Sequence, residues 1–317
     1  MAQASKIQTV DCADWTVLGS GITEVIRVGI GANKSIVVKR LNPNHMNDAD
    51  HVSSFRQEIE ITHRLRHPNV VRVLECRFDP SGAPLMIMEF MRGVTLANFL
   101  CGKQTVKLKG LLEVFTQVLA ALGHIHSQGV LHLDVKPENV FLFQQKSKKI
   151  VTKLMDFGIS QYLSDCNKDC FSKTERFAGT PAYMSPEQCS RNELSPASDI
   201  YSMGCLMYEC LTGVPPFQAE SGFATMFQHL RQPAPAFSSI CPDHNLPGWL
   251  EAIVLRALEK DPKDRFQSTN EMRKELTEAM QQEATDTIWL KRIINIQTNQ
   301  TLYDCVAARE VRDKTTL

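Results

Sequence analysis

Two stretches of this sequence place acids, amides and lysines next to apolar runs. In VLHLDVKPENVFL, residues 130–142, the polar side chains of Asp134, Lys136 and Asn139 interrupt residues that are typical of a buried strand. Further along the chain, Asp156 begins the tripeptide Asp-Phe-Gly. Burying this many polar groups costs free energy unless each has a partner, so the pattern predicts a site that faces a polar ligand.

These residue types would serve phosphoryl transfer. That reaction needs a carboxylate to orient a hydroxyl, oxygen ligands for Mg²⁺ and a cation beside the phosphates. Asp134, Asn139, Asp156 and Lys136 supply those groups, and Lys39, after the strand-like run SIVV, supplies a second cation. Taken alone, Lys39 is better explained as an outward-facing strand residue and Asp-Phe-Gly as a turn, so only their combination indicates this chemistry.

Two further elements would position those groups. Residues 18–21 carry two glycines in a strand–turn–strand pattern that lets backbone N–H groups approach a phosphate chain, although the pattern alone also fits a hairpin turn. Over residues 49–66 apolar side chains recur every three or four positions, which predicts a helix. Glu58 on that helix would pair with Lys39, whereas the nearby Glu60 would point to another face.

The chain is organised as a β-rich part followed by a helical part. Short β-branched runs and one helical pattern lead up to residue 91, and helical patterns dominate after Gly93. The run 198–211 is apolar nearly all round, which predicts a central buried helix. The fold class is therefore α+β. The expected division is an N-terminal extension at 1–14, a small lobe at 15–91, a larger lobe at 92–280 and a C-terminal tail at 281–317.

Taken together and in this order, the motifs resemble the signature of the eukaryotic-type protein kinases. The resemblance runs from about Trp15 to about Met280, most of the chain. It implies the two-lobed kinase fold, with a small β-rich N-lobe that carries one helix and a larger helical C-lobe. It also implies ATP and Mg²⁺ as cofactors, with Mn²⁺ as the alternative metal. Lys136 together with Thr180 is similar to the serine/threonine branch, so the implied substrates are proteins that bear those hydroxyls.

The resemblance also implies roles for single residues. Asp134 would orient the substrate hydroxyl, Asn139 and Asp156 would hold the metal, and Lys136 would touch the γ-phosphate with Thr180 as a further catalytic contact. The implied nucleotide-binding residues are Leu18, Gly19, Gly21, Ile26, Val37, Lys39, Glu58, Met88, Glu89 and Met91. Among them, Met88 would be the gatekeeper, and Glu89 and Met91 would form the hinge whose backbone binds adenine. Val37 and Ile26 would line the adenine pocket.

Other matched residues are implied to be structural. The segment 179–187, GTPAYMSPE, resembles the one that docks the peptide substrate. Glu187 would pair with Arg265 as a tie between helices. Asp199 would hold the backbone of the catalytic loop, which is the stretch that carries Asp134. His132, although close to Asp134, would be structural rather than catalytic.

Four residues depart from the family pattern, of which Ser185, in place of alanine, is a conservative change. Leu133 stands where most of the family has the arginine that pairs with a phosphate on the activation loop. The chain is therefore expected to be of the non-RD type, which is either constitutively competent or controlled by a regulatory protein partner. Glu24 replaces the third glycine of the loop and is expected to face away from the phosphates, because alternate strand residues face opposite sides. Val37 is bulkier than the usual alanine and would narrow the adenine pocket.

The polar linker 164–177 holds further candidates. Ser164, Ser172 and Thr174 could accept phosphate. Cys166 and Cys170 lack the spacing and the additional ligands of a zinc motif, so spectator thiols are favoured over a redox pair or a partial metal site.

Composition excludes several classes of function. The 317 residues carry 35 Lys+Arg and 35 Asp+Glu, which argues against general affinity for nucleic acid or anionic membranes. No apolar stretch is expected to reach the roughly 20 residues of a membrane span, and the start of the sequence lacks the pattern of a signal peptide. With ten scattered cysteines, these features predict a cytoplasmic protein, with the nucleus as the alternative. They do not predict an oligomeric state.

A rival hypothesis is a kinase-fold scaffold that binds signalling partners without catalysis. Glu24 and Leu133 favour that scaffold. The full set of Lys39, Glu58, Asp134, Asn139 and Asp156 favours the enzyme, because scaffolds of this kind typically lack at least one of them.

Overall fold

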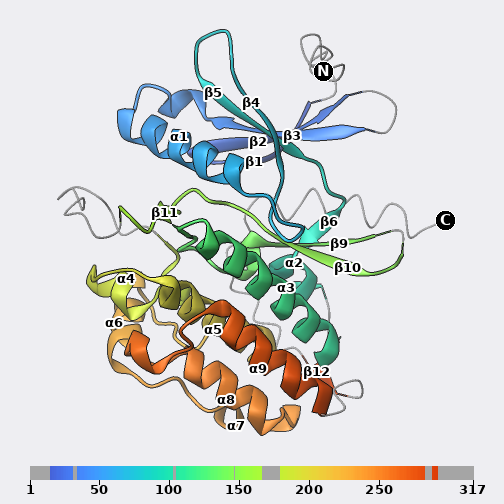
Figure 1. The fold of residues 1–317 in the computed structure, drawn as a ribbon, viewed down its shortest axis with the longest axis vertical. Helices are drawn as coiled ribbons and strands as arrows, with labels where there is room; N and C mark the ends of the chain where they lie inside the picture. Colours follow the sequence, from blue (N-terminus) through green and yellow to red (C-terminus); the bar gives the residue numbers. More distant parts are fainter. Residues whose placement is uncertain are drawn as a thin grey trace. The chain divides into compact units, whose positions relative to one another are not determined.

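The chain folds into two compact units, of which the first ends at Val94 and the second begins at Thr95. A computed structural model describes residues 15–30, 34–102, 105–145, 147–165, 179–282 and 288–291. A β-sheet with one long helix makes up the first unit, and the second is mostly helical, which confirms the predicted fold class (Figure 1). The loop candidates Cys166, Cys170, Ser172 and Thr174 lie outside the described residues.

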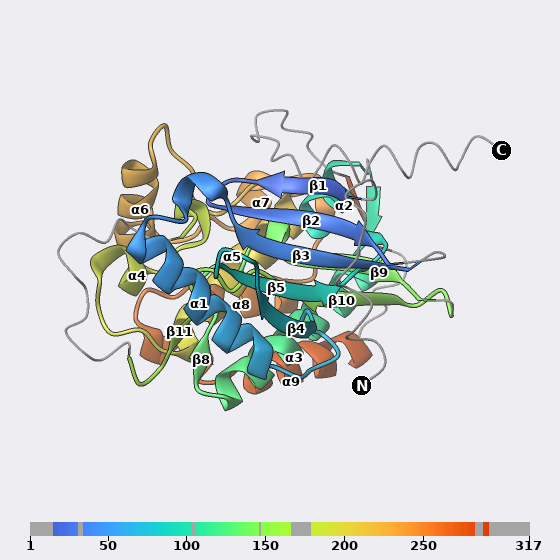
Figure 2. The same cartoon turned by 90° about the horizontal axis from the view of Figure 1, so that it is seen from above.

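The first unit is built on a five-stranded antiparallel sheet with the strand order β1-β2-β3-β5-β4 (Figure 2). Its β-branched and aliphatic residues suit a pleated, half-buried surface. The strands are β1 (Trp15–Ser20), β2 (Thr23–Gly29), β3 (Ser35–Leu41), β4 (Val73–Phe78) and β5 (Pro84–Glu89).

One helix, α1 (Ala49–Arg64), covers one face of this sheet after the short 3₁₀ turn η3 (Pro43–His45). Its first turn is capped by the Asp48 carboxylate, which accepts hydrogen bonds from the backbone N–H groups of Asp50 and His51. Phe55 of α1 packs against Leu41, Val73 and Met86 of the sheet. The opposite face of the sheet buries its own cluster, formed by Ile26, Val28, Ile36, Val38 and Ile87.

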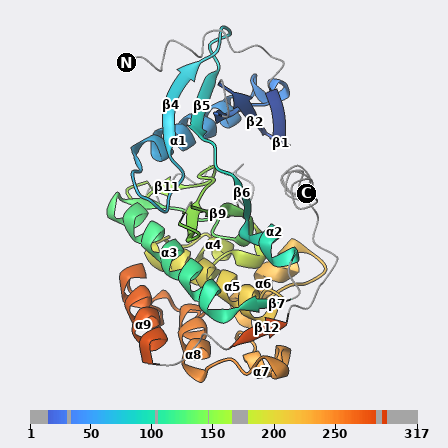
Figure 3. The ribbon, with the colours of Figure 1, turned by 90° about the vertical axis from the view of Figure 1, so that its right-hand side faces the viewer.

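The second unit is arranged around α5 (Pro196–Thr212), which confirms the predicted central helix. Nearly all of its side chains are buried because neighbouring helices cover it on several sides (Figure 3). Those neighbours include α3 (Leu108–Ser127) and α8 (Gly248–Ala257), with α9 (Thr269–Gln282) packed in turn against α3 and α8. The shorter helices are α2 (Leu96–Cys101), α4 (Pro186–Ser190), α6 (Gly222–Arg231) and α7 (Phe237–Ile240).

The helix α3 corrects one expectation from the sequence. Among the described residues it is the one helix that is long and apolar enough to cross a membrane. Ten of its side chains are buried inside the second unit, as in the core helix of a folded domain. Its apolar composition is therefore accounted for by packing.

Short strands complete the second unit. The hairpin of β9 (Val140–Gln144) and β10 (Ile150–Leu154) follows the 3₁₀ turn η4 (Pro137–Asn139), and β8 (Val130–Leu131) pairs with β11 (Gln161–Tyr162). The strand β6 (Gly93–Thr95) spans the boundary between the two units. The remaining 3₁₀ turns are η5 (Pro181–Tyr183), η6 (Pro242–His244) and η7 (Pro262–Asp264).

Part of the expected C-terminal tail belongs to the second unit. The strand β12 (Trp289–Lys291) pairs in antiparallel register with β7 (Thr105–Lys107), which precedes α3 (Figure 3). Leu290 lies opposite Val106, and both side chains are buried. The backbone N–H of Leu108 also donates to the carbonyl of Ile288 at 3.0 Å. The end of the second unit therefore pairs with a strand near its beginning.

We expect this strand pair to contribute to stability. Replacing Leu290 by alanine removes a side chain that is only 1% exposed and should lower the free energy of unfolding by about 3 kcal/mol. The matched control is Leu74→Ala, because Leu74 is 46% exposed and its truncation should cost no more than about 0.5 kcal/mol. Urea unfolding of the two variants and the wild type measures both losses of unfolding free energy. Equal losses would show that β12 does not pack as described.

Candidate active site

A buried ion pair joins β3 to α1. The ammonium of Lys39 lies 2.5 Å from Oε1 of Glu58, and the two residues are 8% and 4% exposed. Glu60 points outward and pairs with Arg64 on the helix surface at 3.5 Å. The predicted pairing of Lys39 with Glu58 rather than Glu60 is therefore confirmed. A lysine held this way presents a fixed positive charge on one face of the sheet.

The glycine-containing turn between β1 and β2 is tight. Ser20 lies opposite Glu24, and the N–H of Gly21 donates to the carbonyl of Thr23 at 3.0 Å. The Glu24 carboxylate is 2.9 Å from both Nε and Nη2 of Arg40. Because Glu24 and Arg40 are directly opposed in the sheet, and Lys39 is the neighbour of Arg40, this carboxylate lies on the face away from Lys39. The expectation that Glu24 faces away is confirmed.

The assignment of Ile26 to the adenine pocket is wrong. The register of β2 on β3 sets Val25 opposite Lys39 and Ile26 opposite Val38. Ile26 is 1% exposed and belongs to the apolar cluster on the other face of the sheet. Side chains alternate along a strand, so an error of one residue changes the face. Val25, which the sequence reasoning missed, shares its face with Lys39 and Val37.

The predicted hinge begins at the end of β5. Met88 lies opposite Val37 and is partly buried against the cluster of Leu41, Phe55, Val73 and Met86. The Glu89 carboxylate accepts the backbone N–H of Arg72 at 2.9 Å, and the Glu89 N–H donates to the Arg72 carbonyl at 3.1 Å. These bonds hold Glu89 to the neighbouring loop. Leu18 and Met91 are partly buried, Gly19 is buried and Gly21 is exposed.

Four of the predicted catalytic residues meet at one carboxylate in the second unit. Asp134 Oδ2 lies 2.6 Å from the Lys136 ammonium and accepts the Asn139 side-chain N–H at 2.9 Å. Its Oδ1 accepts the Thr180 hydroxyl at 3.1 Å. Lys136 in turn donates to the Thr180 hydroxyl oxygen at 2.7 Å. A carboxylate oriented by three neighbours is pre-organised to accept a hydrogen bond from a hydroxyl.

The β9–β10 hairpin brings the two predicted metal ligands together. Val140 lies opposite Leu154, and the N–H of Met155 donates to the Asn139 carbonyl at 3.0 Å. Asn139 and Asp156 therefore flank the open end of the same hairpin. Asn139 directs its side-chain N–H₂ at Asp134, which leaves Oδ1 as its ligand atom, and the Asp156 side chain is exposed. One amide oxygen and one carboxylate are hard donors that fit Mg²⁺.

The backbone before Asp134 is held by a fully buried carboxylate. Asp199 accepts the N–H of His132 at 2.9 Å and that of Leu133 at 2.8 Å, which confirms its predicted role. Nε2 of His126 lies 2.7 Å from the same carboxylate. Burial alone would raise the pKa of Asp199, but the interactions with His126 and His132 together outweigh it and hold the pKa below its ordinary value.

His132 is a structural residue, as the resemblance implied. Its ring is completely buried, and burial lowers its pKa below the ordinary value. Nε2 donates to the Met155 carbonyl at 3.2 Å, and Nδ1 accepts the Asp134 N–H at 3.3 Å. The edge of the ring also packs against Phe157. His132 thereby connects the catalytic loop to the segment that carries Asp156.

Leu133 fills an apolar site with a strained backbone. Its φ of 65° is unusual for a residue with a branched side chain. The side chain is 5% exposed and packs with Leu131, Leu194, Ile159 and Leu163. A guanidinium at this position would lose those contacts, so the surroundings of Leu133 are built for an aliphatic side chain.

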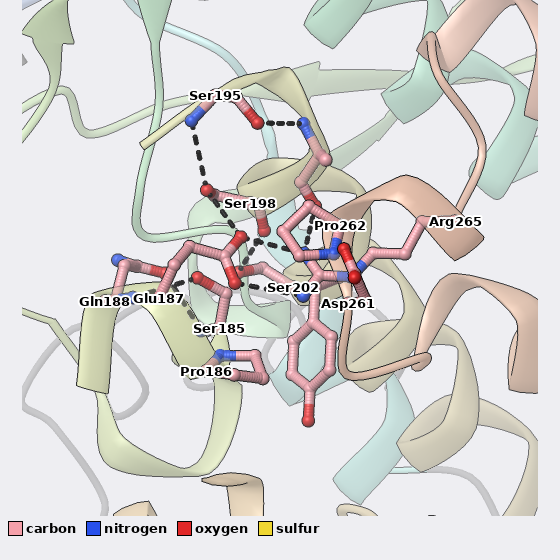
Figure 4. Close-up of polar contacts among 12 residues, drawn as sticks. Ser185, Pro186, Glu187, Gln188, Ser195, Ser198, Ser202, Asp261, Pro262 and Arg265 are labelled. Carbon is pink, nitrogen blue, oxygen red and sulfur yellow. Dashed lines mark hydrogen bonds and ion pairs between the residues drawn. The ribbon is translucent and has the colours of Figure 1, made fainter. Parts of the chain in front are cut away.

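Residues 179–187, the segment predicted to dock the substrate, are tied to the helical core by the predicted ion pair. Nη1 and Nη2 of Arg265 donate to Oε1 and Oε2 of Glu187 at 2.8 and 2.9 Å (Figure 4). The Ser198 hydroxyl adds a bond of 2.7 Å. Burial would raise the pKa of Glu187, but the bonds from Arg265 hold it below its ordinary value. Ahead of this pair, the Tyr183 hydroxyl donates to the Glu209 carboxylate.

A buried histidine lies on α6. His229 Nδ1 is hydrogen-bonded to the Tyr201 hydroxyl at 2.9 Å, and its ring meets Phe217 edge-on. The Lys260 ammonium donates to the same hydroxyl at 3.2 Å. Burial lowers the pKa of His229 to about 3, and the Lys260 charge acts in the same direction. Burial likewise lowers the pKa of Lys260 to about 8.

Sequence comparisons agree with this geometry. Residues 14–282 match the family model of the protein kinase domain. The chain is 33% identical over 279 residues to serine/threonine-protein kinase PknB of Mycolicibacterium smegmatis, covering 85% of this chain and 43% of that protein. It is 33% identical over 261 residues to serine/threonine-protein kinase pkn3 of Myxococcus xanthus, covering 81% and 47%. The chain thus spans less than half of the length of these relatives.

We expect the Glu187–Arg265 pair to be a strong structural tie. Replacing Arg265 by methionine leaves a buried carboxylate without its partner and should cost about 3–5 kcal/mol of unfolding free energy. The double variant Arg265→Met/Glu187→Gln should recover part of that loss. Arg64→Met is the control for an exposed pair and should change stability by no more than about 1 kcal/mol. Denaturant unfolding measures all three, and a loss for Arg265→Met as small as the control would contradict the expectation.

We also expect stability to depend on pH through His229. The unfolded chain takes up a proton near the ordinary pKa of 6.5, while folded His229 stays neutral down to about 3. The contribution of His229 to the free energy of unfolding is therefore complete above pH 6.5. It decreases as the pH falls, by about 2 kcal/mol at pH 5. His229→Gln should lose less stability than the wild type between pH 6.5 and 5. The exposed His63→Gln should follow the wild type, and identical slopes for all three proteins would refute the assignment.

Proposed function

Because this chain belongs to the protein kinase domain family, we propose that it transfers the γ-phosphoryl group of ATP to serine and threonine hydroxyls of protein substrates. The observation that carries the proposal is the convergence of Lys136, Asn139 and Thr180 on the Asp134 carboxylate. The names of its relatives as serine/threonine-protein kinases support the choice of acceptor.

The proposed mechanism is in-line transfer with Asp134 as the residue that orients the attacking hydroxyl and accepts its proton. One carboxylate oxygen is engaged by Lys136 and Asn139 and the other by Thr180, so the side chain is held in a single orientation. Lys136 then places a positive charge beside the acceptor hydroxyl, where it would contact the transferred phosphoryl group. Its bond to Thr180 fixes that charge near the substrate segment.

The nucleotide would be bound by residues of the first unit. Lys39, held by Glu58, would bind the α- and β-phosphates, and the backbone around Gly19 and Gly21 would approach the phosphate chain. Val25 and Val37 lie on the Lys39 face of the sheet and would contact the adenine ring. Met88 would be the gatekeeper, and the backbone of Glu89 and Met91 would form the hinge.

Asn139 and Asp156 would hold the metal, with Mg²⁺ proposed and Mn²⁺ as the alternative. When bound, the ion supplies positive charge that neutralises the phosphate oxygens. The chain's own contribution is the hairpin that holds the two ligands side by side and the hydrogen bonds that orient the Asn139 amide.

We propose further that activity does not depend on phosphorylation of the activation loop. Leu133 carries no charge with which to bind a phosphate, and it is buried in an apolar cluster. A regulatory protein partner is the alternative means of control. The scaffold hypothesis is not favoured, because each charged or amide group that transfer requires is present and Lys39 is paired with Glu58.

The test is transfer of labelled γ-phosphate to a mixed serine/threonine peptide library. Wild-type protein should be active before and after phosphatase treatment, and Asp134→Asn should reduce kcat by at least about 10³-fold because it removes the base. Activity lost on phosphatase treatment would refute the independence from loop phosphorylation. Transfer by the wild type no greater than by Asp134→Asn would favour the scaffold.

A further inference from the structure

The peptide bond that precedes Asp134 is held at both of its polar groups. The Leu133 carbonyl accepts the side-chain N–H of Gln188 at 3.0 Å, and the Asp134 N–H donates to His132 Nδ1 at 3.3 Å. On the other side of Leu133, its own N–H donates to Asp199. Asp199 and His132 were anticipated from the sequence, but Gln188 was not.

Gln188 is itself fixed in one orientation. It lies at the third position of α4, where its Oε1 accepts the Ser185 N–H at 3.0 Å (Figure 4). The backbone N–H of Gln188 donates to the Ser185 hydroxyl at 3.3 Å, which completes a capping box. Because Oε1 is occupied by an N–H donor, Nε2 must be the atom that faces the Leu133 carbonyl. The residue is 8% exposed, so water does not readily replace this bond.

The position of Gln188 connects two parts of the site. The preceding residue, Glu187, accepts two hydrogen bonds from Arg265, and these bonds hold the start of α4 to the helical core. The capping box joins Gln188 to Ser185 of the substrate segment. Its side chain then reaches the catalytic loop one residue before Asp134. Besides the direct hydrogen bond from Thr180 to the Asp134 carboxylate, the Gln188 amide therefore connects the substrate segment to the backbone that carries Asp134.

Resting on the proposed function, we propose that Gln188 is a positioning residue for phosphoryl transfer. It acts through the Leu133 carbonyl and fixes the backbone from which the Asp134 side chain projects. Leu133 is held at a φ of 65°, a conformation that costs roughly 1–3 kcal/mol and persists only where the surroundings impose it. Loss of the Gln188 bond removes one of those restraints.

This link needs no phosphate. In the family pattern an arginine at position 133 reaches a phosphate with its side chain. Here Gln188 of α4 binds the backbone carbonyl of Leu133, which any residue at this position provides, in addition to the contacts that Thr180 makes with Asp134 and Lys136. The link is therefore present in the unphosphorylated chain and is consistent with the buried side chain of Leu133.

The decisive variant is Gln188→Glu in the full chain. A glutamate keeps the oxygen that accepts the Ser185 N–H, but it replaces the donor to Leu133 by an oxygen that repels the carbonyl. We expect kcat to fall at least tenfold, while the KM for ATP changes less than twofold. Gln188→Met, which removes both amide bonds at similar volume, should lower kcat at least as much.

The matched control is Ser221→Ala. Ser221 caps α6, which packs against α4, through the Ala224 N–H, so its loss weakens a helix cap beside α4 and leaves α5 with its Asp199 unchanged. The control should lower the melting temperature slightly and leave kcat within twofold of the wild type. A Gln188→Glu protein that retains kcat within twofold of the wild type would overturn the inference.

Hydrogen exchange supplies a readout that does not depend on activity. The amide hydrogens of Leu133 and Asp134 should exchange faster in Gln188→Glu than in the wild type, and at the wild-type rate in Ser221→Ala. Unchanged exchange in Gln188→Glu would also overturn the inference. No transfer by the wild type would refute the proposed function and the catalytic part of this inference, while the exchange comparison would still decide whether Gln188 holds the loop.

Discussion

The second unit depends on a single buried carboxylate. Asp199 lies in the first turn of α5, where the helix dipole favours a negative charge. It accepts hydrogen bonds from His126 at the end of α3 and from two successive N–H groups of the catalytic loop. The central helix, the helix beside it and the loop that carries Asp134 are thus joined at one side chain. A charge in such a place is stable only because each of its oxygens is hydrogen-bonded.

The hydrogen bonds around Asp199 continue along the catalytic loop to the Asp134 carboxylate. Asp199 holds its N–H groups, Gln188 holds the Leu133 carbonyl, and His132 holds the Asp134 N–H. With the backbone restrained, the Asp134 carboxylate is oriented by Lys136 and Thr180. Polar groups that would be costly to bury singly are tolerated because they form one connected network.

Much of the fold and part of the site could be predicted from the sequence. Two correct predictions came from local patterns, which a sequence shows directly. They are the helical period that placed Glu58 toward Lys39 and the all-apolar run that forms α5. The Glu187–Arg265 and Asp199 contacts came from the family resemblance, and the structure bears them out.

The errors and omissions arose where the outcome depends on geometry that is not local. Ile26 was assigned to the wrong face because the pairing register of a hairpin decides the face, and motif spacing alone does not give the register. His126 carries no motif of its own, and the capping-box pattern at Gln188 does not indicate its contact with Leu133, since these two roles depend on partners 73 and 55 residues away. The strand β12 is three residues long, too short for any periodic signal.

The pairing of β12 with β7 has a consequence for synthesis of the chain. Among the described elements of the second unit, β7 is one of the first to leave the ribosome and β12 is the last. Nearly the whole unit must be translated before β7 gains its partner, so the sheet edge formed by β7 stays unpaired while the helices assemble. An unpaired edge is a site at which nascent chains can associate. Once β12 has been translated, its pairing with β7 removes this open edge.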